Sequence, residues 1–252
     1  MKIGILDSGV GGLTVLRSCL REMPNHDYLY FADSENAPYG VKSKEEVGRL
    51  TCEAVEFLIG KGANVIVIAC NTATSVAAEM LREKYDVPII GMEPAIKPAL
   101  DISRASGKRV LVTATELTLK GEKFLNLVDN LDGDDIIDFC SLSELVEYAE
   151  EAEFREEMIV PYLKWMLSSY DLNDYGSVVL GCTHFPLFKS MFADVLPEGV
   201  EIVDGIDGTV KALSKLVTSE EAGPDVKFYS TKVEVAEGSL FEKFVNILSV
   251  KV

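Results

Sequence analysis

The chain has 252 residues, 48% of them apolar and 26% charged, a composition typical of a globular protein. Lysine and arginine total 24 against 41 aspartate and glutamate residues, and a net charge of −17 without a basic stripe argues against nucleic acid as a direct ligand. The apolar runs fall short of the roughly 20 residues that a membrane span needs. The first residues follow a strand pattern, not that of a signal peptide, so we expect no membrane partner and a cytoplasmic location.

The first half of the chain alternates between predicted strands and helices. Glycine-rich and polar turns separate short β-branched runs from segments with helical periodicity. We expect strands at 2–6, 28–32, 65–70 and 87–90, with helices at 13–22, 43–59 and from residue 75 onward. Strands that alternate with helices predict a mostly parallel sheet covered on both faces.

The second half repeats this alternation after a change in composition at 103–108, which predicts a linker. Its strands are expected at 108–115, 136–140 and 177–182, and its helices at 116–127, 143–157, 161–167 and from Phe185. Trp165 is expected in the core. After Val203 we expect a helix, a strand near Phe228 and a last helix, which pack on the first half.

The spacing of the strand ends suggests an internal duplication. Cys70 follows Asp7 by 63 residues, and Cys182 follows Thr115 by 67. We therefore expect an α/β fold with two pseudo-symmetric α/β domains whose mostly parallel sheets face each other across a cleft, where small-molecule sites are commonly found. The expected domains are 1–95 plus 208–252, and 96–207.

No motif for a nucleotide or a metal is present. The segment 7–12 is glycine-rich and could cradle an anion with backbone N–H groups, but Thr14 stands where a dinucleotide fingerprint needs glycine. No phosphate-binding GxxxxGK[ST] motif occurs. The two histidines and the cysteines lack zinc-ligand spacing, and His26 lies in a polar turn where a surface position is expected. We expect neither a metal nor a cofactor.

Five cysteines, without CxxC spacing or an export signal, do not predict a disulfide framework. Cys19, Cys52 and Cys140 lie among apolar residues and are expected to be small buried side chains. Cys70 and Cys182 differ, because each ends a predicted strand and is followed by small polar residues. The carboxyl ends of parallel strands are where ligands collect in α/β sheets, so this pair is the candidate reactive site.

Two thiols on opposite walls of a site suit a reaction in which a proton leaves one face of a carbon and arrives on the other. One sulfur acts as the thiolate base and the other as the thiol acid. His184 and Asp7 are candidates to assist them, because a thiolate needs a neighbouring donor or base. A single Cys/His pair at Cys182 and His184 would serve acyl transfer, but it leaves Cys70 without a role.

Several segments together resemble the glutamate racemase family, within the aspartate/glutamate racemases. They follow the family order along nearly the whole chain: Asp7-Ser8-Gly9-Val10-Gly11-Gly12-Leu13-Thr14, Pro38-Tyr39-Gly40, Cys70-Asn71-Thr72-Ala73, Glu93-Pro94-Ala95 and Leu180-Gly181-Cys182-Thr183-His184-Phe185-Pro186-Leu187. The resemblance implies a cofactor-independent racemase that interconverts L- and D-glutamate and supplies D-glutamate for peptidoglycan synthesis.

The resemblance also implies roles for individual residues. Cys70 would take the α-proton from D-glutamate and Cys182 from L-glutamate, with Asp7, His184 and Glu147 assisting. Asp33 would assist or cap its loop. The implied substrate contacts are Asp7, Ser8, Pro38, Tyr39, Gly40, Asn71, Thr72, Thr115, Thr183 and His184. Similar enzymes are commonly dimers, so a homodimer is expected.

Three alternatives remain open on the sequence. An aspartate or other amino-acid racemase could share the fold, and a non-catalytic amino-acid-binding regulator could share the cleft, although binding alone does not require two thiols. A hydrolase using Cys182 and His184 is the third alternative.

Overall fold

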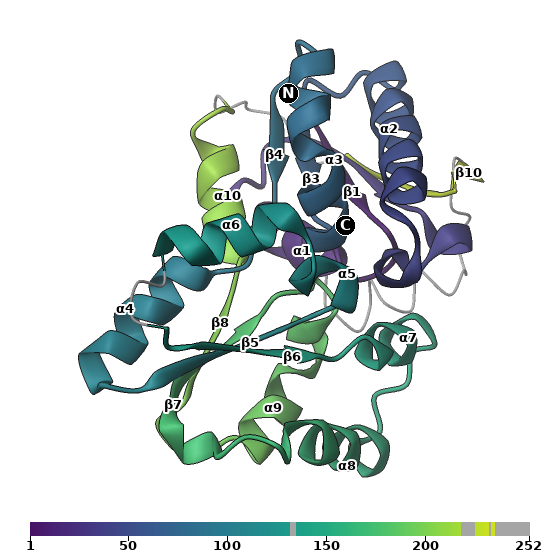
Figure 1. Cartoon of the computed structure of the whole chain (residues 1–252). Coiled ribbons are helices and arrows are strands. Elements are labelled where there is room, and N and C mark those ends of the chain that lie inside the picture. The colour runs from purple at the N-terminus through teal and green to yellow at the C-terminus, as the bar shows by residue number, and fades with distance from the viewer. Residues whose placement is uncertain (132–134, 218–224, 232, 235–252) are drawn as a thin grey trace.

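The computed structural model describes residues 1–131, 135–217, 225–231 and 233–234 (Figure 1). These residues form two sheets. The first has the strand order β10-β9-β2-β1-β3-β4 and the second has the order β6-β5-β7-β8. Neighbouring strands are parallel, apart from the antiparallel pair β9 and β10. The predicted α/β fold with mostly parallel sheets is confirmed.

The first sheet contains β1 (Lys2–Asp7), β2 (Asp27–Ala32), β3 (Val65–Ile68), β4 (Ile89–Gly91), β9 (Val226–Ser230) and β10 (Val233–Glu234). Its described helices are α1 (Leu13–Glu22), α2 (Lys44–Gly60), α3 (Asn71–Lys84) and α10 (Ile206–Ser214), with the short 3₁₀ turns η1 (Ser34–Asn36) and η2 (Tyr39–Val41).

Side chains of these strands point alternately to two apolar layers, as the two-residue period of a strand requires. Ile3 and Ile5 pack with α1 and α10 on one face, and Leu6 packs with α2 and α3 on the other. Both faces are therefore buried, which explains why β1 and β3 are nearly continuous apolar runs.

The second sheet contains β5 (Arg109–Ala114), β6 (Ile137–Ser141), β7 (Tyr175–Leu180) and β8 (Glu201–Asp204). Its elements outside the sheet are α4 (Ile96–Ser106), α5 (Glu116–Leu119), α6 (Glu122–Leu131), α7 (Glu144–Glu150), α8 (Glu156–Leu167), η3 (Leu172–Asp174), η4 (Phe185–Phe188) and α9 (Lys189–Val195). Helices α4 and α6 cover one face, and α7, α8 and α9 cover the other.

The chain passes twice between the sheets, once from β4 to α4 and once from β8 to α10 (Figure 1). The two passing segments touch, since a Cβ added at Gly205 would lie 2.4 Å from the carbonyl oxygen of Glu93. No side chain other than hydrogen fits at this crossing without a shift.

Three predicted elements need correction. The prediction of a linker at 103–108 is wrong for its first part, because α4 continues to Ser106. Ser103 is fully buried, and its hydroxyl donates a hydrogen bond to the Arg109 carbonyl. Gly107, at φ 67°, makes the turn. The helix expected at 116–127 is two helices, α5 and α6, and the long acidic helix is divided into α7 and α8, with Ala152 between them in the left-handed region at φ 56°.

The burial of three side chains also differs from the sequence-based expectation. Trp165 is 68% exposed, because α8 turns its neighbours Ile159 and Leu163 to the core instead. His26 is only 4% exposed, although its turn is polar. Cys19 and Cys140 are buried as predicted, whereas Cys52 is half-buried, with the Lys84 ammonium 2.9 Å from its sulfur.

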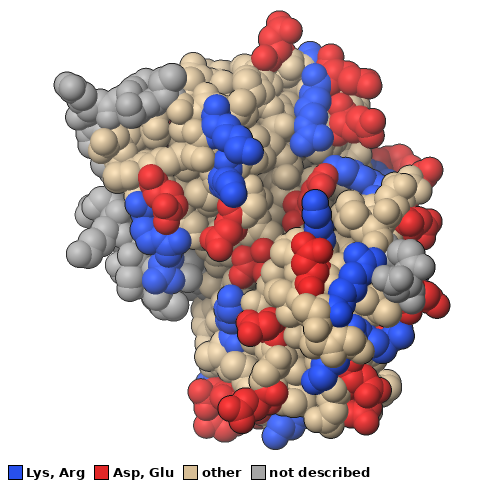
Figure 2. Space-filling view, turned by 90° about the vertical axis from the view of Figure 1, so that its left-hand side faces the viewer, with Lys and Arg blue, Asp and Glu red and all other residues tan. Residues whose placement is uncertain are grey.

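On the face shown in Figure 2, lysine and arginine side chains are interspersed with aspartate and glutamate and do not gather into one stripe. Within the described ranges, no helix is long and apolar enough to cross a membrane. The helix predicted after the strand near Phe228 lies outside the described residues.

Candidate active site

The two candidate cysteines come from different sheets. Cys70 follows β3 and is the N-cap of α3, where its sulfur accepts a hydrogen bond from the Ala73 amide at 3.4 Å. Cys182 follows β7 and precedes η4. Both are nearly closed to solvent, with 5% and 7% of their surface exposed. The duplicated sequence pattern thus places one buried thiol at the end of one strand in each sheet.

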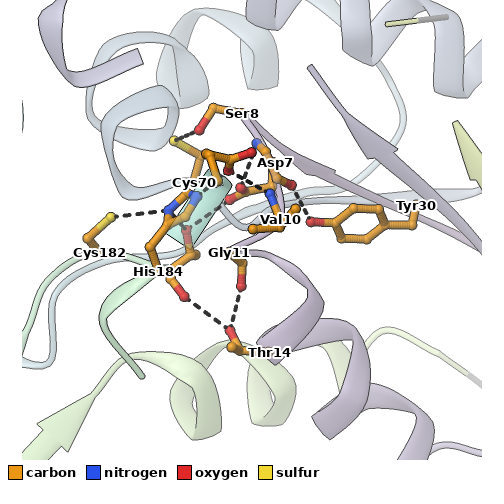
Figure 3. A network of polar contacts seen from close by, with 12 residues as sticks. Asp7, Ser8, Val10, Gly11, Thr14, Tyr30, Cys70, Cys182 and His184 are labelled. Atoms are coloured by element: carbon orange, nitrogen blue, oxygen red, sulfur yellow. Dashed lines mark hydrogen bonds and ion pairs between the residues drawn. The ribbon is translucent and has the colours of Figure 1, made fainter. Parts of the chain in front are cut away.

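Burial raises the pKa of Cys70 to about 12, and the nearby Asp7 carboxylate adds to this effect. Cys182 contributes a smaller increase to the pKa of Cys70, so the two thiols act on each other electrostatically. The Cys70 thiol lies 3.7 Å from the Ser8 hydroxyl (Figure 3). Near neutral pH, Cys70 is therefore the protonated thiol.

Cys182 has a different environment, dominated by His184. The Cys182 sulfur is 3.6 Å from His184 Nδ1, and His184 Nε2 is 2.6 Å from Glu150 Oε1. Burial by itself lowers the pKa of His184, but its hydrogen bonds to Cys182 and Glu150 outweigh burial and place the pKa well above its usual range. The raised pKa favours the protonated form of His184, whose two ring N–H groups would face the Cys182 sulfur and the Glu150 carboxylate.

Asp7 links the first sheet to the second. Its carboxylate is fully buried and accepts hydrogen bonds from the Gly9 amide at 2.9 Å and from the Thr183 hydroxyl at 3.0 Å. Burial raises the pKa of Asp7, although the positive charge of His184 opposes this shift. Asp7 and His184, predicted from opposite halves of the sequence, therefore belong to one network.

The glycine-rich segment after Asp7 allows the two halves to approach. A Cβ added at Gly9 would lie 1.7 Å from Glu150 Oε1, and one at Gly11 would lie 2.6 Å from His184 Nδ1. Both distances are shorter than a Cβ atom can approach another heavy atom without a shift. The glycines are required here by side chains from the other half of the molecule, of which Figure 3 shows His184 beside the loop.

Three threonine hydroxyls form a second polar cluster. Thr72 and Thr115 are 3.0 Å apart, and Thr118 lies 3.1 Å from Thr72 and 3.0 Å from Thr115. All three are buried. Gly40 packs closely on this cluster, because a Cβ there would be 2.8 Å from Thr115. Thr118 is not among the predicted site residues, although it follows the predicted Thr115 by only three residues.

Tyr39 is anchored by Asp33, to which its hydroxyl donates a hydrogen bond at 2.6 Å. Burial and this carboxylate raise the pKa of Tyr39, so it stays protonated. Pro38 precedes it, and the Asp33 carboxylate also accepts a hydrogen bond from the side-chain Nδ2 of Asn36 at 3.0 Å. Asp33 therefore holds its own loop in this structure.

The acidic helix α7 places a different glutamate at the site from the one predicted. Glu147 is exposed, whereas Glu150, three residues later, contacts His184 and accepts a hydrogen bond from the Val10 amide at 2.8 Å. In the structure it is therefore Glu150 that makes the contact with His184. Four glutamates lie within 144–151, and only the direction of the helix decides which one reaches His184.

Asn71 begins α3 beside Cys70 and is 4% exposed, yet its Oδ1 has no hydrogen-bond partner among the described residues. A buried amide oxygen without a partner is unfavourable unless a ligand supplies one. Across the same described ranges, no group of three histidine, cysteine, aspartate or glutamate side chains is arranged to hold a metal ion.

Comparison with known proteins gives a consistent result. Residues 3–213 match the Asp/Glu/Hydantoin racemase family. The chain is 50% identical to the glutamate racemase of Halothermothrix orenii, over 98% of this chain and 99% of that protein. It is 44% identical to glutamate racemase 2 of Bacillus subtilis, over 99% and 96% of the two chains.

The fold also matches solved structures. The glutamate racemase isoform RacE1 of Bacillus anthracis superimposes with a TM-score of 0.86 at 29% identity, covering 99% of this chain and 94% of that one. The family match over most of the chain, and the similarity to two racemases over nearly its full length, establish the family. The chain belongs to the Asp/Glu/Hydantoin racemase family.

Proposed function

We propose that this protein interconverts L- and D-glutamate by proton transfer at the α-carbon, without a cofactor, and that it supplies D-glutamate for peptidoglycan synthesis. The names of the similar proteins support glutamate as the substrate. One observation carries the mechanism: two buried thiols follow strands of different sheets, and each has its own polar partners.

The two thiols have different polar neighbours, and we assign their roles in the reaction from this difference. We assign Cys182, which faces His184 Nδ1, as the base for L-glutamate, and Cys70, whose pKa is raised by burial, as the acid. With L-glutamate bound, the Cys182 thiolate takes the α-proton and forms an S–H bond. Cys70 then delivers its own proton to the opposite face of the carbanion, which gives D-glutamate and leaves Cys70 as the thiolate. The opposite protonation state serves D-glutamate.

Neighbouring groups support each half-reaction. On the Cys182 side, His184 stabilises the thiolate and Glu150 holds the charge on His184. We propose Glu150, in place of Glu147, as the assisting carboxylate. On the Cys70 side, the Asp7 carboxylate is, after burial, the largest contribution to the raised pKa of Cys70, and we propose Asp7 as the assisting group there.

The substrate contacts follow from the same arrangement. The unpartnered oxygen of Asn71 is suited to accept a hydrogen bond from the α-ammonium group of the substrate. Small polar groups around the two cysteines would bind the carboxylates, and we assign this role to Ser8, Thr72, Thr115, Thr183 and the Pro38-Tyr39-Gly40 segment. We also propose two domains, 1–95 plus 208–252 and 96–207, and a homodimer, which light scattering in solution tests.

The mechanism is tested with two single variants, Cys70→Ala and Cys182→Ala. Each should abolish racemisation of glutamate, measured by circular dichroism without added cofactor. Each should still eliminate a good leaving group from one enantiomer of a β-substituted glutamate, and the two variants should prefer opposite enantiomers. A variant that racemised glutamate at nearly the parent rate would overturn the two-base assignment.

The alternatives are separated by two further measurements. Solvent deuterium should enter the α-carbon of glutamate when the parent protein is incubated in D₂O, which a binding regulator would not cause. Rates over a set of D-amino acids distinguish a glutamate racemase from an aspartate racemase. Rescue of a bacterial strain that requires D-glutamate for its cell wall tests the role in peptidoglycan synthesis, and failure to rescue would contradict that role.

A further inference from the structure

The side chain of Tyr30 contacts the glycine-rich segment 7–12, and Tyr30 is not one of the predicted site residues. Tyr30 is on β2 and is fully buried, and its hydroxyl donates a hydrogen bond to the Gly9 carbonyl at 2.7 Å (Figure 3). Burial raises the pKa of Tyr30 well above its usual range, and the negative charges of Asp7 and Glu150 add to this. The hydroxyl therefore keeps its proton and is a permanent donor.

The Gly9 carbonyl and the Val10 amide belong to one peptide group, and its two ends are held from opposite sides. Tyr30 donates to the oxygen, and the Val10 N–H donates to Glu150 Oε1 at 2.8 Å. Because a peptide group is planar, fixing its oxygen also fixes the direction of its N–H bond. Tyr30 thus sets how Val10 points toward Glu150.

The same glutamate oxygen contacts His184, and His184 contacts Cys182. A continuous path of four contacts consequently runs from the Tyr30 hydroxyl to the Cys182 sulfur, across both sheets. Hydrogen bonds in such a chain polarise one another inside a protein. Cys70 lies off this path, since its sulfur contacts Ser8 and the Ala73 amide.

Close packing leaves the path little freedom to rearrange. A Cβ at Gly12 would lie 2.8 Å from the Tyr30 hydroxyl, and one at Gly9 would overlap the Glu150 carboxylate. Loss of the Tyr30 hydroxyl would leave the Gly9 carbonyl without this donor and release the orientation of its peptide group. Glu150 would then be held less firmly against His184.

We propose that Tyr30 is a positioning residue for Cys182, the cysteine of the opposite sheet, and that it acts through the Gly9–Val10 peptide group, Glu150 and His184. This inference deepens the proposed function, because it rests on Cys182 being a reacting thiol. In this proposal only Cys182 depends on Tyr30. A side chain of the first sheet therefore affects the reactivity of the thiol that follows a strand of the second sheet.

The test compares Tyr30→Phe with Tyr28→Phe. Phenylalanine keeps the ring and removes only the hydroxyl. Tyr28 is a matched control on the same strand, also fully buried, whose hydroxyl donates to the Met23 carbonyl at 2.7 Å, away from the path. Iodoacetamide labelling of the folded proteins at neutral pH, read by peptide mass spectrometry, gives separate rates for Cys70 and Cys182.

In Tyr30→Phe we expect the labelling rate of Cys182 to fall on the order of threefold to tenfold, the effect of one hydrogen bond. The rate of Cys70 should stay at the parent value, and Tyr28→Phe should change neither rate. In glutamate racemisation, Tyr30→Phe should lower kcat more than it changes KM. Equal changes at both cysteines, or a Cys182 rate like that of Tyr28→Phe, would overturn the proposal. Absence of racemisation by the parent protein would instead refute the proposed function, and the labelling rates would still be readable.

Discussion

Replacing Glu150 by glutamine removes one charge from the site and nearly preserves its shape. The amide oxygen of glutamine can still accept the hydrogen bond from Val10, which is 2.8 Å from Glu150 Oε1. The 2.6 Å contact with His184 Nε2 loses its charge. The Glu150 side chain is 19% exposed, so solvent screens this contact only weakly.

The expected loss follows from the contact. A hydrogen bond between charged groups contributes about 1.5–3 kcal/mol. At about 1.4 kcal/mol for each factor of ten, kcat/KM for glutamate should fall roughly 10- to 150-fold. L- and D-glutamate have equal free energies, so kcat/KM must fall by the same factor in both directions, as circular dichroism from either enantiomer can verify.

The pH dependence gives a second readout. Glu150 is one of the groups that raise the pKa of His184, so glutamine should lower it. In Glu150→Gln, fewer molecules then carry a protonated His184 as the pH rises. The loss of kcat/KM relative to the parent should therefore grow from about pH 6.5 upward. The reasoning is refuted if Glu150→Gln keeps the parent kcat/KM, or if Glu147→Gln, one turn earlier on α7, causes the larger loss.

Further predictions concern stability and the approach of the two halves. Because the pKa of His184 is raised on folding, its contribution to stability is complete below about pH 6.5 and is lost as the pH rises through the folded value. The free energy of unfolding of His184→Gln, measured with urea, should therefore differ from that of the parent most at acidic pH. An equal difference at alkaline pH would contradict this. Gly11→Ala should abolish most activity by pushing against His184, whereas Gly208→Ala, with no atom within 4 Å of its added Cβ, should raise the free energy of unfolding by up to about 1 kcal/mol. Phe192→Ala should lower it by about 3–5 kcal/mol, because Phe192 is fully buried, while Trp165→Ala at a 68% exposed position should change it by less than about 0.5 kcal/mol; calorimetry that ranked these two aromatics the other way would show the packing to be wrong.

The parts of the site that sequence could predict are those tied to strand ends. Parallel strands in a covered sheet present their carboxyl ends to one edge, so Cys70 and Cys182 could be placed from the residues that follow each apolar run. The glycines after Asp7 signalled close approach of something to the backbone. What approaches, the Glu150 carboxylate, belongs to the other half of the chain and left no local signal.

The parts that could not be predicted depend on how helices turn and on main-chain partners. Helix α8 is apolar on most sides, and its periodicity does not show that Trp165 faces outward while Tyr162 faces the core. Glu147 and Glu150 are chemically alike, and packing alone selects between them. Tyr30 reads as an ordinary core residue, because its partner is a carbonyl group that no side-chain pattern reveals.

The position of β9 bears on the order in which the protein can form during synthesis. This strand comes from the last part of the chain and lies between β2 and the edge strand β10. The strands β2, β1, β3 and β4 are all made before residue 92, and the whole second sheet is made before β9 leaves the ribosome. The second sheet can therefore fold while the first still lacks β9 and β10, and truncation before Val226 would expose the edge of β2 to pairing with other chains.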